Sequence, residues 1–251
     1  MPKLMDDGMQ ENIKIPGGGN FSFSAIRLDN LGATEYTLVT IVTDVTGSVS
    51  GFAKELLEMK KTIIKACKKS PRAENLLVRD ILFNDIIGVR EVHGFKLLNM
   101  IDPDKDYQPF NPNGATPLYQ ATYEGIGATI SYSKSLMDQD FNCNGAVYII
   151  TDGEDNVPGF ATPAKIEKMV KDAEQKETII ESLITVLIGV NARQCTRALN
   201  EFHVNAGLTQ YIDAGDATPQ RLAKLAGWVS KSISSQSQAL GSGSASQPLQ
   251  F

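Results

Sequence analysis

Three oxygen-bearing side chains follow an apolar run at alternating positions early in the chain. The stretch "TLVTIVTDVTGSVSGF" reads as a buried strand that ends at Asp44, with Thr46 and Ser48 two and four residues later. A second apolar run, "AVYIITD", ends at Asp152, and the polar turn "NPNGATPL" contributes Thr116. Two carboxylates and three hydroxyls are hard oxygen ligands, which Mg²⁺ prefers and Mn²⁺ and Ca²⁺ also accept. We therefore predict that these five side chains form a Mg²⁺ site with few protein ligands and open coordination positions.

The elements that must position these residues alternate between strands and helices. Apolar runs and helical periodicity alternate along the chain, which is typical of crossover connections and a parallel sheet. The predicted fold is α/β: a Rossmann-like, doubly wound, mostly parallel sheet of about six strands with helices on both faces. The predicted strands are 21–28, 36–44, 75–83, 89–95, 145–152, 181–190 and 209–215, and the predicted helices are 51–69, 117–137, 163–176, 193–207 and 218–233.

Two of the predicted strands end in aspartate and are the most apolar of the set. Ligands of open α/β sheets bind beyond the carboxyl ends of the strands, where the winding direction reverses. If the strands that end at Asp44 and Asp152 are neighbours at that point, both carboxylates face one crevice. Thr116 precedes a predicted helix and is expected at the same edge.

The chain is expected to hold one domain between two polar ends. Residues 1–20 are polar and end in a run of glycines, which predicts a flexible arm. Residues 21–233 form the predicted domain, which includes an extra N-terminal strand at 21–28 with one face exposed to solvent. Residues 234–251 are rich in Ser, Gly and Gln, which predicts a flexible tail.

The motif "DVTGS … GATPL … YIITDGE" resembles the metal-ion-dependent adhesion site (MIDAS) of the von Willebrand factor type A (vWA) domain family. Asp44, Ser48, Thr116 and Asp152 match its pattern, and Thr46 stands where the family usually has Ser. The resemblance covers about residues 36–232 and implies that the open metal position accepts a carboxylate from a partner protein. It also implies that the last helix shifts in relatives that switch.

A second and looser similarity concerns the end of the predicted domain. The segment "GWVSKSI" is similar to the C-terminus of bacterial stress-type vWA proteins, including the tellurium-resistance group. This similarity covers few residues, and it implies a role in stress response.

Composition narrows the classes of partner and compartment. The net charge is −5, and no basic run is longer than three residues, which argues against nucleic acid as a partner. The three cysteines are an odd number and far apart, which predicts free thiols in a reducing compartment. Without a signal-peptide pattern or an apolar stretch of membrane length, we expect a cytoplasmic protein that does not insert in a membrane. The sequence leaves the oligomeric state open.

Other interpretations of the same residues remain open at this stage. Ser48 or Ser50 could simply cap the helix that follows, with Asp44 only ending a strand. Glu154 and Asp155 are expected to be solvated loop charges. The leading hypothesis is a non-catalytic, Mg²⁺-dependent protein-interaction module, because no His lies near the motif in sequence and no Cys or Lys is placed to act as a nucleophile or base. The alternatives are a metal-dependent hydrolase such as a phosphatase, and an RNA-associated scaffold.

Overall fold

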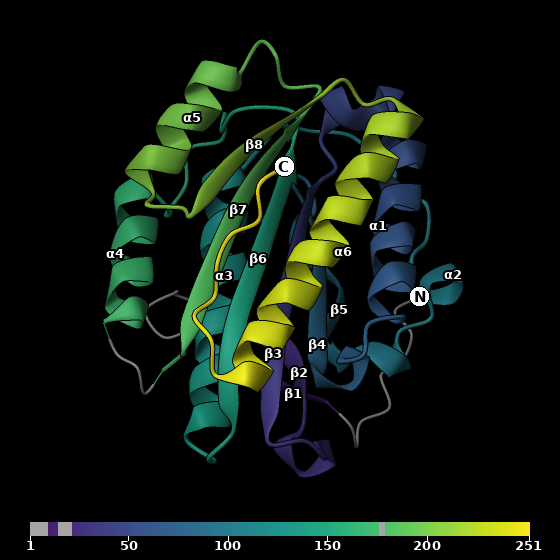
Figure 1. The fold of residues 1–251 in the computed structure, drawn as a ribbon. Helices are drawn as coiled ribbons and strands as arrows, with labels where there is room; N and C mark the ends of the chain where they lie inside the picture. The colour runs from purple at the N-terminus through teal and green to yellow at the C-terminus, as the bar shows by residue number, and fades with distance from the viewer. Residues whose placement is uncertain (1–9, 15–21, 176–178) are drawn as a thin grey trace.

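The protein, described here from a computed structural model, is built around one twisted sheet with helices on both faces (Figure 1). The structure describes residues 10–14, 22–175 and 179–251. Within them the sheet has eight strands in the order β1-β2-β5-β4-β3-β6-β7-β8. The strands are β1 (Gln10–Lys14), β2 (Ser22–Ile26), β3 (Glu35–Asp44), β4 (Leu76–Asn84), β5 (Gly88–Leu97), β6 (Asn142–Thr151), β7 (Ser182–Val190) and β8 (Gln210–Gly215). The α-helices are α1 (Ala53–Cys67), α2 (Pro103–Asp106), α3 (Leu118–Met137), α4 (Pro163–Glu174), α5 (Thr196–Asn205) and α6 (Pro219–Ser242).

The central strands confirm the predicted doubly wound arrangement. β3 pairs in parallel with β4 on one side and with β6 on the other, and β7 and β8 continue the parallel set. Among the described strands, the antiparallel pairs are β4–β5 and β1–β2. Because the chain winds from β3 toward β4 and later returns past β3 to β6, the winding direction reverses between β3 and β6.

Two helical layers bury the sheet. Helices α1 and α6 cover one face, and α3, α4 and α5 cover the other (Figure 1). Close packing of α3 depends on Gly125, since a Cβ atom at this position would lie 2.8 Å from Cγ2 of Val42 in β3.

A buried ion pair joins α1 to β4. Lys60 Nζ lies 2.7 Å from Asp80 Oδ1, and the two side chains are 1% and 0% exposed. Burial lowers the pKa of Lys60, while the charge of Asp80 opposes that shift. Removing either partner would leave an uncompensated charge inside the protein.

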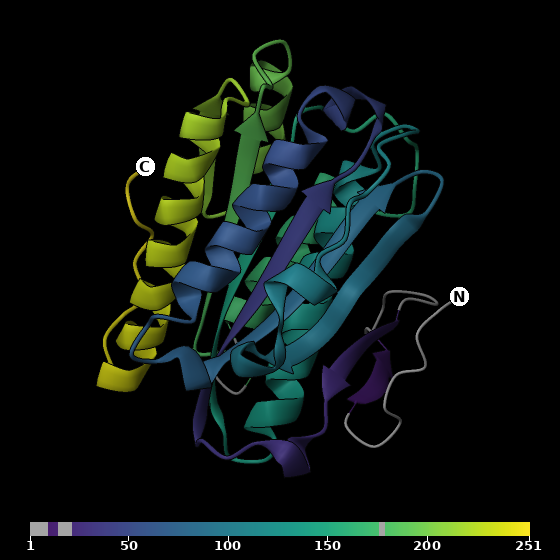
Figure 2. The same cartoon turned by 90° about the vertical axis from the view of Figure 1, so that its right-hand side faces the viewer.

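The N-terminal side differs from the expectation in two respects. The predicted arm contains β1, which pairs with β2 at the edge of the sheet next to β5 (Figure 2); the rest of 1–20 lies outside the described residues. β2 is also buried on both faces rather than one, because Phe23, Ser24 and Ala25 are all at most 3% exposed. Serine can occupy this buried position because its hydroxyl donates a hydrogen bond to Glu91 (2.6 Å).

The C-terminal boundary also differs. Helix α6 was predicted to end at residue 233 and continues to Ser242, where Gly243 adopts the left-handed conformation that ends helices. Beyond it, the chain runs back along the sheet beside α6 (Figure 1). Trp228 donates a hydrogen bond to the Gln250 carbonyl (2.9 Å), and its ring meets Phe251 edge-on, with ring centroids 5.9 Å apart.

Candidate functional site

The two predicted aspartates lie side by side at the ends of neighbouring strands. In the β3–β6 pair, Thr43 is opposite Ile150, so Asp44 is level with Thr151 and Asp152 follows directly. This edge is the reversal point of the winding, where α/β sheets bind their ligands. The expected juxtaposition is therefore present.

Asp44 is held in one orientation by two hydrogen bonds. Its Oδ1 accepts from the backbone N–H of Thr46 (2.8 Å), and its Oδ2 accepts from Oγ1 of Thr151 (2.7 Å). The side chain is only 1% exposed. Sequence analysis did not single out Thr151, which acts across strands and therefore leaves no local pattern.

A chain of hydroxyls connects the two acidic strand ends. Thr46 Oγ1 lies 3.1 Å from Ser48 Oγ, and Ser48 Oγ donates to Asp152 Oδ1 (2.8 Å). The alternative in which Ser48 only caps a helix is wrong, because α1 has Phe52 at its N-cap position and no side-chain cap hydrogen bond.

Thr116, in the loop before α3, is held at the same edge by two hydrogen bonds to Asn156, in the loop after β6. Its backbone N–H donates to Asn156 Oδ1 (2.7 Å), and its carbonyl accepts from Asn156 N–H (3.0 Å). Thr116, Ser48 and Asp152 line one hollow of about 530 Å³. Three of the five predicted ligands therefore line one hollow, and the other two, Asp44 and Thr46, are buried beside it and joined to it by the hydrogen bonds of Thr46 and Ser48. Asn156, which also lines the hollow, was not anticipated.

The loop after β6 also corrects one expectation. Asp155 is not a solvated charge, because its Oδ1 accepts a hydrogen bond from the backbone N–H of Tyr119 (2.9 Å) in the first turn of α3. This contact ties the loop to the helix that begins just after Thr116. Glu154 is exposed, as expected.

A positive φ angle shapes the loop before Thr116. Gly114 has φ 72°, and its carbonyl accepts from the backbone N–H of Gly47 (3.1 Å), between Thr46 and Ser48. A Cβ atom at Gly114 would lie 2.1 Å from Asp85 Oδ1. Glycine therefore lets three segments, including the β4–β5 turn, meet at the site.

The electrostatics of the crevice favour a cation. Burial raises the pKa of Asp44 to about 6, and the nearby negative charge of Asp152 adds to the rise, against the lowering effect of the Thr151 and Thr46 hydrogen bonds. Burial also raises the pKa of Asp152, while the Ser48 hydrogen bond opposes this. In the part of the chain that the structure describes, neither carboxylate forms an ion pair with Lys, Arg or His.

The donor set fits a hard divalent cation and does not fit zinc. It offers carboxylate and hydroxyl oxygens, which suit Mg²⁺. Among the described residues, no group of three or more His, Cys, Asp and Glu side chains is placed to hold a metal. A metal held here would thus rely on the hydroxyls of Thr46, Ser48 and Thr116 and on water.

The far wall of the crevice is formed by the turn after β7, which sequence analysis missed. Arg193 lines the same hollow, together with Asn191 and Cys195. Asn191 has φ 56°, a conformation rare for residues other than glycine, and its N–H donates to the Gly215 carbonyl (2.7 Å). Arg193 Nη2 lies 3.2 Å from Asp216 Oδ2 in an exposed ion pair, which is weak enough to rearrange.

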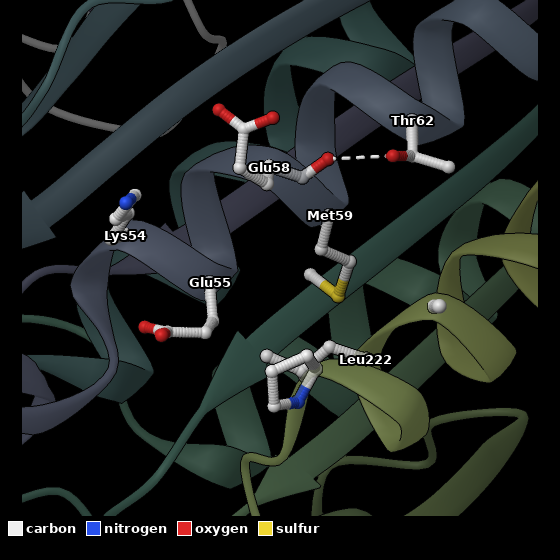
Figure 3. A pocket seen from close by; sticks show the side chains of 8 residues that line it. Lys54, Glu55, Glu58, Met59, Thr62 and Leu222 are labelled. Carbon is white, nitrogen blue, oxygen red and sulfur yellow. Dashed lines mark hydrogen bonds between the residues drawn. The ribbon is translucent and has the colours of Figure 1, made fainter.

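A separate groove of about 240 Å³ lies between α1 and α6 (Figure 3). Met59 and Leu222 form its apolar floor, while Glu55 and Glu58 lie on the α1 side. It shares no residue with the crevice at the strand ends, so it is not part of the candidate site.

Neither histidine belongs to the crevice. His93 is buried, with Nε2 3.0 Å from the Tyr107 hydroxyl. His203 lies in α5 and is half-buried.

Comparison with known proteins supports the fold and leaves the chemistry open. No known family profile and no curated protein sequence matches the chain. Solved structures that resemble it include proximal thread matrix protein 1 (PTMP1) from the mussel byssus, with 15% identity and a TM-score of 0.52 over 80% of this chain and 47% of that chain. Another is the pilus adhesin SpaC from Lactobacillus rhamnosus GG in its open conformation, with 11% identity and a TM-score of 0.54 over 85% and 32% of the respective chains.

The likeness is one of fold. The chain spans less than half the length of either structure. At this level of identity the likeness shows the α/β fold alone, and the vWA-type metal site that the sequence motif implies stays a prediction. The similarity of the C-terminal segment to stress-type proteins stays a prediction.

None of the described helices is long and apolar enough to span a membrane. Even α6, with 24 residues, lacks the continuous apolar stretch that a membrane span requires.

Proposed function

We propose that this protein is a non-catalytic interaction module that binds a carboxylate of a partner protein through a divalent cation, Mg²⁺ by preference. The observation that carries the proposal is the pair of desolvated carboxylates, Asp44 and Asp152, which are joined by hydroxyls and form no ion pair among the described residues, since Arg193 of the same hollow pairs with Asp216. Asp44 and Asp152 would hold the ion, partly through water, and Thr46, Ser48 and Thr116 would supply hydroxyl oxygens. The bound ion would supply positive charge that accepts the partner's carboxylate.

Other residues of the chain would orient the Asp44 carboxylate and contact the carboxylate of the partner. Thr151 and the backbone of Thr46 fix the Asp44 carboxylate, so little conformational entropy is lost when a ligand binds. Arg193 lines the same hollow and carries donors for the partner's second carboxylate oxygen. Its exposed ion pair with Asp216 can give way at little cost.

The hydrolase alternative is less well supported. Lys and His are absent from the described lining of the hollow, so no general base other than a carboxylate faces it. Turnover of a generic phosphate ester that disappears in Asp152→Asn would favour the hydrolase. RNA binding is supported less than either, because a chain with a net charge of −5 repels the phosphate backbone.

We further propose that the protein acts in a reducing compartment such as the cytoplasm. Cys67, Cys143 and Cys195 are all free thiols, and the first two are buried.

Titration calorimetry with Mg²⁺ tests the metal site. We expect binding by the wild type and its loss in Asp152→Asn, with Glu154→Gln as the matched control, since Glu154 lines the same hollow without contacting the hydroxyl chain. Equal Mg²⁺ binding by wild type and Asp152→Asn would refute the site. Affinity purification in Mg²⁺ with EDTA elution tests the partner role, and partners recovered equally well in EDTA and with Asp44→Ala would refute it.

A further inference from the structure

Two exposed isoleucines lie next to the candidate metal site. Ile86 and Ile87 form the turn between β4 and β5 and are 64% and 38% exposed. They are among the few large apolar side chains that the described surface exposes to this extent. Exposing two adjacent aliphatic side chains to water is unfavourable, and covering them on binding would release that free energy.

The turn is rigidly attached to the segments that carry the site. Asn84 Oδ1 accepts from the backbone N–H groups of Ile86 (2.9 Å) and Ile87 (2.8 Å). Asn84 Nδ2 in turn donates to Asn113 Oδ1 (2.8 Å) and to the carbonyl of Val45 (3.3 Å), directly after Asp44. The isoleucine pair is therefore held in place before any partner arrives.

The Thr116 loop makes a second connection. Asp85 Oδ1 accepts from the Ala115 N–H (2.7 Å), and the Asp85 N–H donates to the Ala115 carbonyl (3.1 Å). The β4–β5 turn and the loops after β3 and β6 reach the same end of the molecule (Figure 2). Ile87 also lines a hollow of about 440 Å³ together with Val45 and Phe110, which leaves room for a side chain beside the site.

Strand spacing gives the distance between the two features. The site lies between β3 and β6, and the turn joins β4 and β5, the next two strands along the sheet. Neighbouring strands are about 4.8 Å apart, which puts the turn roughly 7 Å from the site at its β4 end and roughly 12 Å at its β5 end. In an extended segment, residues two apart are about 7 Å apart and point to the same side.

We propose that the partner is an extended segment with a bulky aliphatic side chain two residues from its metal-binding acidic residue, and that Ile86 and Ile87 receive this side chain. The proposal rests on the proposed function and adds the chemistry of the partner. The carboxylate supplies metal dependence, and the aliphatic contact selects among acidic segments.

Phage display of a peptide library with a fixed central Asp and random neighbours tests the proposal. The library is selected on the protein in Mg²⁺, and bound phage are eluted with EDTA. Wild type should enrich Leu, Ile, Val, Met or Phe two positions from the fixed Asp. Ile86→Ser with Ile87→Ser should lose this enrichment and keep EDTA-elutable binding, while Val204→Ser should keep both.

Val204 is a matched control because it is 63% exposed, like Ile86, but lies on α5. A synthetic peptide from the selection should lose about tenfold in affinity for wild type when its aliphatic residue is changed to Ser, and much less for the double variant. EDTA-elutable phage without aliphatic enrichment would overturn the inference and leave the proposed function standing. Enrichment unchanged by the double variant would overturn it as well. Absence of EDTA-elutable phage would overturn both.

Discussion

Replacing Asp44 by Asn should have opposite effects on stability with and without metal. The carboxylate is 1% exposed, and burial raises its pKa from 3.8 to about 6. A rise of this size corresponds to about 3 kcal/mol of folding free energy. In the metal-free protein at pH 7.5, the ionised Asp44 therefore destabilises the fold by up to that amount.

Asparagine removes the buried charge and keeps most of the hydrogen bonds. Its amide oxygen can still accept from the Thr46 N–H, and the Thr151 hydroxyl can turn to accept from the new amide and donate to the Gly153 carbonyl. We expect Asp44→Asn to raise the free energy of unfolding by about 1 to 3 kcal/mol in EDTA. The variant should also lose the stabilisation by Mg²⁺, which for a one-site ligand at 100 times its Kd is about 2.7 kcal/mol.

The pH dependence of folding stability tests independently whether the Asp44 carboxylate destabilises the metal-free fold. Because the folded-state pKa of Asp44 lies above its unfolded value, the metal-free wild type should lose stability as pH rises from about 4 to 6 and then level off. Below pH 6 protons compete with the ion, so Mg²⁺ affinity should fall. Asp44→Asn should flatten this part of the stability curve.

Urea denaturation at pH 5 and pH 7.5, in EDTA and in Mg²⁺, measures all of these quantities. The reasoning would be refuted if Asp44→Asn were less stable than wild type in EDTA at pH 7.5, or if Mg²⁺ stabilised both proteins equally. Glu154→Gln is the control for the loss of one negative charge at this edge, and it should change neither the Mg²⁺ effect nor the slope with pH.

Further predictions concern the core and the C-terminal segment. Lys60→Met should lower the free energy of unfolding by about 3 to 5 kcal/mol, measured by urea denaturation, because it leaves Asp80 charged and unpaired. The double variant Lys60→Met with Asp80→Asn should recover most of this loss. A double variant as unstable as Lys60→Met would contradict this reasoning. Gly125→Ala should lower the denaturation midpoint, because overpacking against a β3 valine methyl costs about 1 to 3 kcal/mol and outweighs the roughly 1 kcal/mol gained in helix propensity. Phe251→Ala should shift the fluorescence of Trp228 to longer wavelength by exposing the indole, and unchanged emission would show that the two rings are apart in solution.

Much of the fold follows from local patterns. The runs that became β3 and β6 are nearly continuous stretches of apolar residues, as strands buried on both faces must be. An aspartate stands at the end of each run, Asp44 as the last residue of β3 and Asp152 directly after β6, where the strand leaves the core. The register that places Asp44 level with Thr151 then follows from parallel pairing of neighbouring strands.

Where the local pattern was weak, the prediction was wrong. The polar sequence after residue 233 suggested a tail, yet α6 continues to Ser242, because Gln236, Ser237 and Leu240 are buried on one side of the helix. Gln236 finds partners there, since its backbone carbonyl accepts a hydrogen bond from Asn144 Nδ2 and its side-chain Nε2 donates one to the Gln247 carbonyl. Tertiary contacts satisfied polar groups that composition alone assigned to solvent.

The sequence by itself determined the identities and the common edge of the five candidate ligands, since apolar runs and the residues that end them are local properties. Only the tertiary structure decided which groups orient and flank them: Thr151 on Asp44, Asn156 on Thr116, and Arg193 on the far wall. The first of these contacts joins residues 107 positions apart in the chain and the second joins residues 40 positions apart. No spacing rule predicts them, because they depend on how strands and loops come to lie beside one another once the core has packed.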